Sequence, residues 1–264
     1  MRMPPVARAV ILAAGKGSRL NGASDEVPKC LVQLGGVSLI GRQIRVLRDA
    51  GIDDIVVVVG CQADRVRRAC GHDVTYIENV RYAQTNSLYS LWMARPLLYR
   101  GFVVLNCDVL FHPALLTDLL ASRHENALLL GYRDASQPAY GDEEMKVKVH
   151  RGRVADMSKE MAPAEADGEN LGIVKFGARG AAALVDIMDG LIAEGRLRDW
   201  APRAFAVFAR THALHAVGTR GLPWIEIDFP EDFDRARHEI LPAIEQDESR
   251  PSTCDRAVIS PGVS

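Results

Sequence analysis

A glycine-rich loop that carries two cations follows directly after the first apolar run of the chain. Gly15 and Gly17 let the backbone approach a ligand closely and turn N–H groups toward it, while Lys16 and Arg19 add positive charge. This combination is typical of a polyphosphate site. The spacing fits neither a Walker A loop nor a dinucleotide fingerprint, which would need a third glycine where Leu20 stands. On its own, the loop is equally compatible with a tight strand-to-helix turn.

A proline–lysine pair stands nine residues beyond Arg19 and leads into a second apolar stretch. Together the two segments form the pattern LAAGxGxRL…PKxLV, which resembles the nucleotidyltransferases that activate sugar phosphates and phosphoalcohols. The resemblance extends over about residues 8–243. It implies that Lys29 and Arg19 act on the phosphates. It also implies a set of nucleotide-binding residues, namely Leu12, Ala13, Ala14, Gly15, Lys16 and Gly17.

Two later segments supply the carboxylates that such an enzyme needs. Asp108 follows the apolar run 102–105, and alternation along the predicted strand 224–228 puts Glu226 and Asp228 on one face. The resemblance implies that these three residues bind the catalytic Mg²⁺, a hard ion that prefers carboxylate and phosphate oxygens. The structural alternatives are a helix N-cap at Asp108 and a solvated strand position at Glu226.

A finer resemblance rests on the segments 79–91 and 224–233. Both are similar to segments of cytidylyltransferases of the phosphocholine and phosphonate type. This similarity implies CTP as the nucleoside triphosphate, with Asn86 and Ser87 meeting its base or ribose from the start of a helix. Ordinary N-capping of that helix is the alternative explanation for the same two residues.

The acceptor side is predicted from lysines in the second half of the chain. A lysine inside an apolar strand is costly unless its charge is paired, so we expect Lys146 and Lys175 to bind the acceptor phosphate, with Glu169 near the acceptor's other end. An exposed edge-strand position is the alternative for each lysine. Four aromatic residues are available for a cage around a quaternary ammonium but are better explained as core or rim residues: Tyr132, Tyr140, Trp200 and Trp224.

The reaction implied by the resemblance joins a nucleoside triphosphate to a phosphate or phosphonate monoester and releases pyrophosphate. The attacking oxygen is already ionised at pH 7, so catalysis consists of positioning and electrostatic stabilisation. The first hypothesis is a cytidylyltransferase that makes a CDP-alcohol or a CMP-phosphonate. The alternatives are a sugar-1-phosphate nucleotidyltransferase that uses UTP or dTTP and a non-catalytic nucleotide-binding regulatory protein. The identity of the acceptor stays open.

The elements that must position these residues alternate between strands and helices in the first half of the chain. Three continuous apolar runs bounded by turn residues predict strands buried on both faces of a parallel sheet, at 9–14, 55–59 and 102–105. Helical patterns lie between and after them, at 37–50, 87–98 and 113–121. The alternation predicts an α/β fold with a doubly wound, mostly parallel, Rossmann-like sheet.

The second half predicts an antiparallel insertion into that sheet. Residues 145–150 and 154–157 flank Arg151–Gly152 as a hairpin, and 171–176 forms another strand, so we expect an acceptor-binding insertion at about 132–176. Helices are predicted at 179–194, 198–209 and 230–245. The whole is interpreted as a single nucleotidyltransferase domain, 1–246, followed by a mobile tail, 247–264.

Composition excludes several other classes of protein. The 264 residues carry 32 Lys and Arg against 34 Asp and Glu, a net charge of −2, which argues against nucleic acid as a partner. No apolar run approaches the roughly 20 residues of a membrane span, and no signal peptide is evident. Five cysteines without a CxxC pair predict neither a disulfide framework nor a zinc site, which favours a cytoplasmic protein. The oligomeric state, a homodimer included, stays open.

Overall fold

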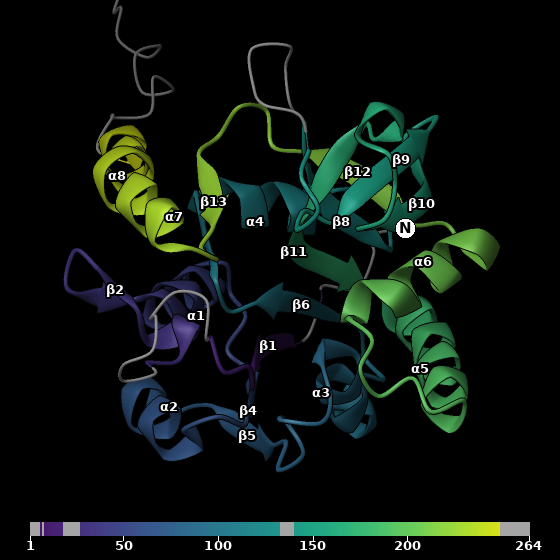
Figure 1. The fold of residues 1–264 in the computed structure, drawn as a ribbon, viewed down its shortest axis with the longest axis horizontal. Coiled ribbons are helices and arrows are strands. Elements are labelled where there is room, and N and C mark those ends of the chain that lie inside the picture. The colour runs from purple at the N-terminus through teal and green to yellow at the C-terminus, as the bar shows by residue number, and fades with distance from the viewer. Residues whose placement is uncertain (1–5, 7, 18–26, 133–139, 249–264) are drawn as a thin grey trace, which may run out of the picture.

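The computed structural model describes residues 6, 8–17, 27–132 and 140–248, so Arg19 lies outside the described residues. Its central feature is a nine-stranded mixed sheet with helices on both faces (Figure 1). In order across the sheet, the strands are β5 (Thr75–Glu78), β4 (Ile55–Val59), β1 (Ala9–Ala13), β6 (Phe102–Asn106), β11 (Gly168–Phe176), β8 (Ala127–Gly131), β12 (His215–Gly218), β10 (Arg153–Ser158) and β9 (Lys146–His150).

The half of the sheet from β5 to β6 is parallel, as predicted. β1 and β4 are buried on both faces, and this is why they appear in the sequence as continuous apolar runs. β5 is absent from the sequence prediction because Thr75–Glu78 is only half-buried and mixes polar with apolar residues. The carboxyl ends of β1 and β6 lie side by side, because Leu12 is paired with Asn106.

The other half of the sheet is largely antiparallel. β11 runs antiparallel to β6 and β8, and the first residues of β11 also pair with β9, so that this half curls back on itself. The predicted hairpin is confirmed as β9 and β10, joined at Arg151 and Gly152. Both turn residues have left-handed φ angles, 50° and 76°, which match the right-handed twist of the two strands.

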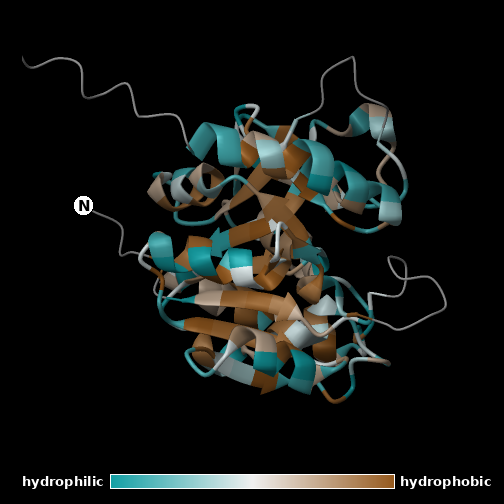
Figure 2. Cartoon of the chain, turned by 90° about the vertical axis from the view of Figure 1, so that its left-hand side faces the viewer, coloured by the Kyte–Doolittle hydropathy of each residue, from teal (hydrophilic) through white to brown (hydrophobic). Residues whose placement is uncertain are grey.

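Six helices cover the two faces of the sheet, as a doubly wound fold requires. One face is covered by α1 (Leu39–Asp49), α2 (Ala63–Cys70) and α4 (Pro113–Ala121), and the other by α3 (Ser87–Met93), α5 (Ala178–Ala193) and α6 (Ala201–Thr211). Apolar residues gather in the strands, with more hydrophilic residues on the outer helices (Figure 2). α3 is shorter than predicted: it ends at Met93 and gives way to a 3-10 turn, η2 (Arg95–Leu97), since Pro96 cannot continue an α-helix.

A smaller layer attaches the C-terminal segment to the sheet. β13 (Trp224–Glu226) pairs with β7 (Val109–Phe111) rather than with the main sheet, and the predicted strand 224–228 ends at Glu226. The predicted closing helix is present as α7 (Pro230–Arg235), a π-helical segment η4 (Ala236–Ile240) and α8 (Leu241–Glu248). The remaining short elements are η1 (Lys29–Leu31), β2 (Gln33–Leu34), β3 (Val37–Ser38) and η3 (Pro163–Glu165).

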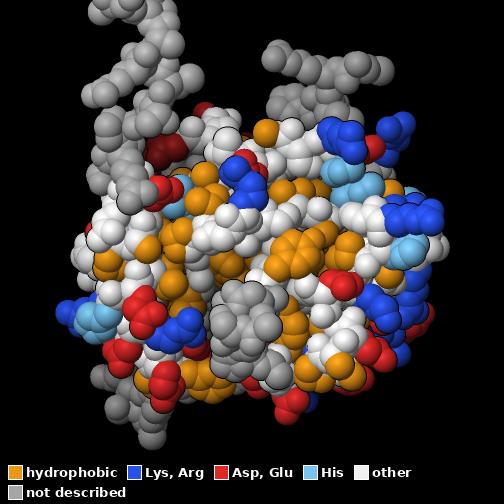
Figure 3. Space-filling model, turned by 90° about the horizontal axis from the view of Figure 1, so that it is seen from above, with side chains coloured by type: hydrophobic (Ala, Val, Ile, Leu, Met, Phe, Trp, Pro, Cys, Tyr) orange, Lys and Arg blue, Asp and Glu red, His pale blue; other side chains and the backbone are white. Residues whose placement is uncertain are grey.

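The surface agrees with the balanced composition. Both signs of charge are scattered among apolar side chains on the face shown in Figure 3. No helix in the described ranges combines the length and apolarity needed to cross a membrane.

Candidate active site

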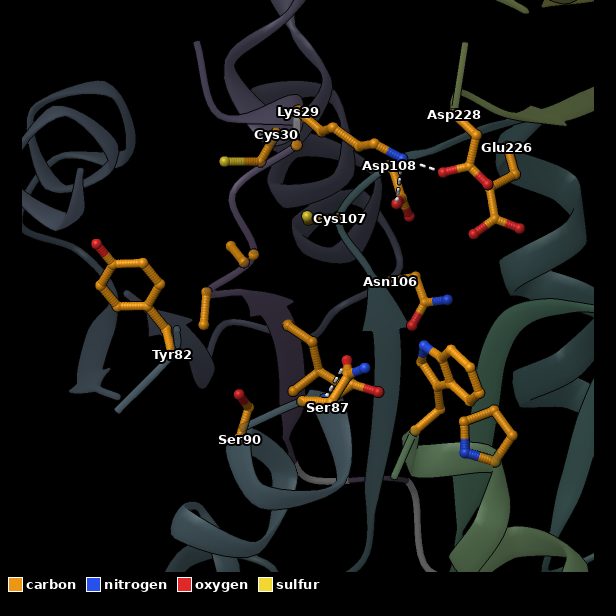
Figure 4. A pocket seen from close by; sticks show the side chains of 18 of the residues that line it. Lys29, Cys30, Tyr82, Ser87, Ser90, Asn106, Cys107, Asp108, Glu226 and Asp228 are labelled. Carbon is orange, nitrogen blue, oxygen red and sulfur yellow. Dashed lines mark hydrogen bonds and ion pairs between the residues drawn. The ribbon is translucent and has the colours of Figure 1, made fainter. Parts of the chain in front are cut away.

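A cavity of about 300 Å³ opens at the carboxyl ends of β1 and β6 (Figure 4). This is the edge at which ligands bind in open α/β sheets, because the loops that follow parallel strands converge there. Most of the predicted site residues line it: Leu12, Ala13, Ala14, Gly15, Gly17, Lys29, Asn86, Ser87, Asp108, Glu226 and Asp228. Lys16 is exposed and does not line the cavity.

Lys29 stands at the centre of the charged part of this cavity. It begins η1, and its ammonium donates a hydrogen bond to Asp228 and lies 3.6 Å from Oδ2 of Asp108. Burial lowers the pKa of Lys29, but attraction to Asp108, Asp228 and Glu226 outweighs this effect, so its pKa is raised overall. Lys29 is therefore a partly buried ammonium that stays charged at neutral pH.

Three carboxylates surround this ammonium. One oxygen of each of Asp108, Glu226 and Asp228 lies within 4.8 Å of the others (Figure 4). Burial raises the pKa of Asp108 and raises that of Glu226 well above its usual range, and repulsion between the carboxylates adds to both shifts. Oδ1 of Asp108 is buried and has no hydrogen-bond partner among the described residues. A buried carboxylate oxygen without a donor, within a set of hard oxygens, fits a divalent cation such as Mg²⁺.

The pairing of β7 with β13 brings these carboxylates together. Glu226 is in register with Val109, and the backbone N–H of Ile227 donates to the carbonyl of Asp108 at 2.9 Å. The side chain of Asp232 then accepts hydrogen bonds from the backbone N–H groups of Asp228, at 3.1 Å, and of Phe229, at 2.9 Å. Asp228 is thus held by a turn and a capping residue, and not by continuation of the strand.

The start of α3 forms the floor of the cavity and is tied to the segment before α6. Oδ1 of Asn86 accepts a hydrogen bond from the backbone N–H of Ser87 at 2.8 Å. The hydroxyl of Ser87 accepts one from the backbone N–H of Ala201 at 2.8 Å, and the N–H of Leu88 donates to the carbonyl of Asp199 at 3.2 Å. The helix start that we expect to meet the nucleotide is therefore braced by the element that carries Trp200.

Several lining residues are missing from the sequence prediction. They include two amides, Asn106 and Asn170, and an ion pair, Glu143 and Lys159, which lies beside Trp200, one of the four aromatic residues considered for a cage. Lys159 follows directly after β10, and its position at a strand end was the available signal. The prediction instead selected lysines inside strands. Contacts between Glu143, Lys159 and Trp200 join segments far apart in the chain, so no local pattern reveals them.

Lys175 is a correction to the predicted acceptor site. β11 runs antiparallel to β6, so Lys175 pairs with Val103 at the start of β6, at the opposite end of the sheet from the cavity. It lines a second cavity of about 190 Å³ and donates hydrogen bonds to the carbonyls of Ser122, at 2.9 Å, and Leu120, at 3.4 Å. These carbonyls end α4, where a cation is favourable. The cost of a lysine in an apolar strand is thus offset by a helix end and not by a ligand.

Lys146 and Glu169 also lie outside the set of lining residues. They are in register with each other across β9 and β11. Lys146 is 1% exposed, and its ammonium donates to the carbonyl of Gly141 at 2.6 Å. The predicted contact of Lys146 with an acceptor phosphate is therefore corrected as well, because this ammonium is enclosed and serves the backbone of the preceding loop.

Gly17 controls the position of Lys29. Its φ is +67°, and a Cβ at this position would lie 2.9 Å from Cγ and 3.1 Å from the backbone N of Lys29. We expect Gly17→Ala to displace Lys29 and to lower kcat/KM for nucleotidyl transfer by at least about tenfold, because small misplacements of reacting groups reduce the rate strongly. Gly36→Ala is the matched control, since Gly36 has φ +78° and no atom within 4 Å of the added Cβ. Equal losses in both variants would contradict this expectation.

The lowered pKa of Lys175 predicts a pH-dependent stability. Burial lowers this pKa from 10.5 to about 8. Between these two pH values the unfolded chain holds a proton that the folded chain has released, so the contribution of Lys175 to the free energy of unfolding rises with pH. We expect urea unfolding of wild type and Lys175→Met to diverge as the pH rises from 8 to 10, in favour of wild type. Lys148→Met, at an exposed position, is the control. If the stabilities of wild type and Lys175→Met changed in parallel with pH, the lowered pKa of Lys175 would be refuted.

The model of a known family matches most of the chain. Residues 9–171 match the family described as MobA-like NTP transferase domain. The chain is 26% identical over 239 residues to a bifunctional IPC transferase and DIPP synthase of Aquifex aeolicus, with 89% of this chain and 52% of that protein covered. It is 36% identical over 120 residues to a choline-phosphate cytidylyltransferase of Streptococcus pneumoniae, with 44% of this chain and 52% of that protein covered. The chain thus spans about half the length of these curated relatives.

A solved structure shows the same fold. The inositol-1-phosphate CTP transferase from T. maritima superposes with a TM-score of 0.75 at 19% identity, covering 93% of this chain and 98% of that one. The resemblance inferred from the loop and the Pro28–Lys29 segment, and the Rossmann-like α/β fold that it implies, are both confirmed. Since the family model covers more than half of its residues, this chain belongs to the family of MobA-like NTP transferase domains.

Proposed function

We propose that this protein is a cytidylyltransferase that joins CTP to a small phosphate or phosphonate monoester and releases pyrophosphate. The observation that carries the proposal is the convergence in one cavity of a glycine-rich loop, the partly buried ammonium of Lys29 and three carboxylates. A reaction between two anions needs positive charge and a cation beside the reacting phosphates. Lys29 supplies the positive charge, and the three carboxylates would hold the cation.

The three carboxylates would hold the metal. Asp108, Glu226 and Asp228 offer only hard oxygen ligands, so we propose Mg²⁺ as the cation. When bound, Mg²⁺ offsets the charge of the phosphate oxygens that it touches. The ammonium of Lys29, which balances these carboxylates in the free protein, would bind the α-phosphate of the nucleotide or the incoming phosphate.

The remaining residues of the cavity orient the two substrates. The loop at Gly15 and Gly17 brings backbone N–H groups to the triphosphate, with Lys16 and Arg19 as its cations, and the start of α3 at Asn86 meets the base or ribose. The acceptor oxygen is ionised near neutral pH, so no side chain has to remove a proton from it. The chemistry of this chain therefore consists of alignment and charge stabilisation.

The names of the relatives support cytidylyl transfer to a phosphoalcohol. One relative is a choline-phosphate cytidylyltransferase and a solved structure of the same fold is an inositol-1-phosphate CTP transferase, so the names include different acceptors. A cytoplasmic location belongs to the proposal, because the four cysteines in the described part of the chain are free thiols.

Pyrophosphate release tests the proposal directly. Purified protein with Mg²⁺ is given CTP, UTP, dTTP, ATP or GTP, each with a panel of phosphomonoesters and phosphonates. We expect release with CTP and at least one acceptor. A preference for UTP or dTTP with a sugar 1-phosphate would replace the proposal by the sugar-nucleotide alternative. Absence of release with every pair, together with CTP binding in calorimetry, would indicate a non-catalytic nucleotide-binding protein.

A further inference from the structure

An ion pair stacked on an indole forms one wall of the cavity. Nζ of Lys159 lies 3.1 Å from Oε2 of Glu143 and 4.9 Å from the centre of the Trp200 ring. The three residues come from three separate segments: the approach to β9, the end of β10 and the N-cap of α6. All three line the cavity, so they face whatever molecule enters it.

In this arrangement Lys159 occupies the Glu143 carboxylate and the face of the Trp200 ring, the two groups that could otherwise bind a cationic part of a ligand. An aromatic face and a carboxylate are the usual partners of an ammonium group in a binding site. Here Lys159 already lies against both of them. The other carboxylates that line the cavity are Asp108, Glu226 and Asp228, which surround Lys29 and form the proposed metal site. Among the described lining residues, therefore, every carboxylate already has a lysine beside it, and Lys159 would repel a cationic group that approached Trp200.

The cavity is also lined by uncharged polar side chains, both hydroxyls and amides. Asn106 and Asn170 line the cavity, and Asn170 is only 6% exposed, with its Oδ1 accepting a hydrogen bond from the backbone N–H of Gly172 at 3.2 Å. Gly172 also leaves space for Asn106, because a Cβ there would lie 2.5 Å from Nδ2 of that amide. Each amide combines donor and acceptor atoms, so it can both donate to and accept from a hydroxyl group.

We propose that the acceptor is a phosphomonoester whose alcohol portion is hydroxylated and carries no positive charge, and that the Lys159–Glu143 pair rejects acceptors with a cationic end. This inference rests on the proposed function, and it assigns Lys159 as a residue that determines specificity. Each contact of the pair is modest, because Lys159 is 21% and Glu143 is 44% exposed. Selectivity arises from the combination of an occupied carboxylate and a like charge at the site of entry.

Two acceptors that differ only at their far end test the inference. Both are assayed with CTP and Mg²⁺: 2-hydroxyethyl phosphate carries a hydroxyl at the position where phosphoethanolamine carries an ammonium. We expect kcat/KM of wild type to favour the hydroxyl compound by at least about tenfold, or about 1.4 kcal/mol. Lys159→Met keeps the stem of the side chain but removes the positive charge beside Glu143 and Trp200, so this ratio should fall at least about tenfold. Any role that Lys159 shares toward both acceptors cancels in the ratio.

Two further variants keep the test independent of folding. Lys159→Arg retains the charge and should retain the preference, whereas Glu143→Gln should not improve the use of phosphoethanolamine. Two results would overturn the inference: a wild type that prefers phosphoethanolamine, or a ratio of kcat/KM values in Lys159→Met that stays within twofold of the wild-type ratio. In either case, pyrophosphate release would still support the proposed function. Release with neither these two nor any other acceptor of the panel would instead refute the proposed function and the inference with it.

Discussion

Asp108→Asn is expected to lower kcat for pyrophosphate release by at least about 100-fold, while the protein remains folded. Asn keeps the size of the side chain but removes the charge that would hold the cation. One oxygen of Asp108 is buried without a hydrogen-bond partner among the described residues, and the other faces Lys29. Neither position contributes a hydrogen bond to the core, so we expect the unfolding temperature to change by no more than about 4 °C.

Asp118→Asn is the matched control for this variant. Asp118 accepts a hydrogen bond from Nε of Arg220 at 3.0 Å in a partly exposed ion pair, and neither residue lines the cavity. Such pairs contribute about 1 kcal/mol or less, so both activity and stability should change little. Binding of Mn²⁺ alone, followed by electron paramagnetic resonance, separates loss of the cation from loss of alignment. Near-normal turnover or unchanged Mn²⁺ affinity in Asp108→Asn would remove this residue from the metal site.

The sequence patterns that succeeded are those whose cause is local. β1 and β4 were predictable because strands buried on both faces must be apolar throughout. The turn at Arg151 and Gly152 was predictable because the hairpin needs two left-handed residues in succession. The residues of the carboxylate cluster came from a motif, but its geometry did not come from strand alternation: Asp228 lies beyond the end of β13.

The patterns that failed depend on topology. Lys175 lies in an apolar strand, as a phosphate-binding lysine could, but the antiparallel direction of β11 carries it to the wrong end of the sheet. The C-terminal carbonyls of α4 provide its partners, and nothing near Lys175 in the sequence indicates that this helix ends there in space. Lys159 illustrates the converse, because its importance depends on Glu143 and Trp200, which only the folded chain brings beside it.

Lys29 connects the two halves of the proposed chemistry, because its ammonium would compete with the proposed metal for the same carboxylates. In the free protein it donates to Asp228 and lies near Asp108. Lys29→Met leaves these carboxylates without a counter-charge. We therefore expect Mn²⁺ alone to bind the variant more tightly, by about tenfold, while kcat falls by about 100-fold or more because the positive charge at the reacting phosphate is lost.

The opposite directions of these two effects distinguish this role from simpler ones. If Lys29 were only structural, its replacement would lower metal affinity and stability together. If it only bound substrate, its replacement would raise KM and leave kcat nearly unchanged. Lys148→Met, at an exposed position of β9, controls for the loss of one positive charge from the whole protein. Tighter Mn²⁺ binding with a large loss of kcat in Lys29→Met alone would show that Lys29 holds the carboxylates for the cation in the free protein and is released to the phosphates when the cation arrives. Unchanged Mn²⁺ affinity would show that Lys29 and the cation do not share these ligands.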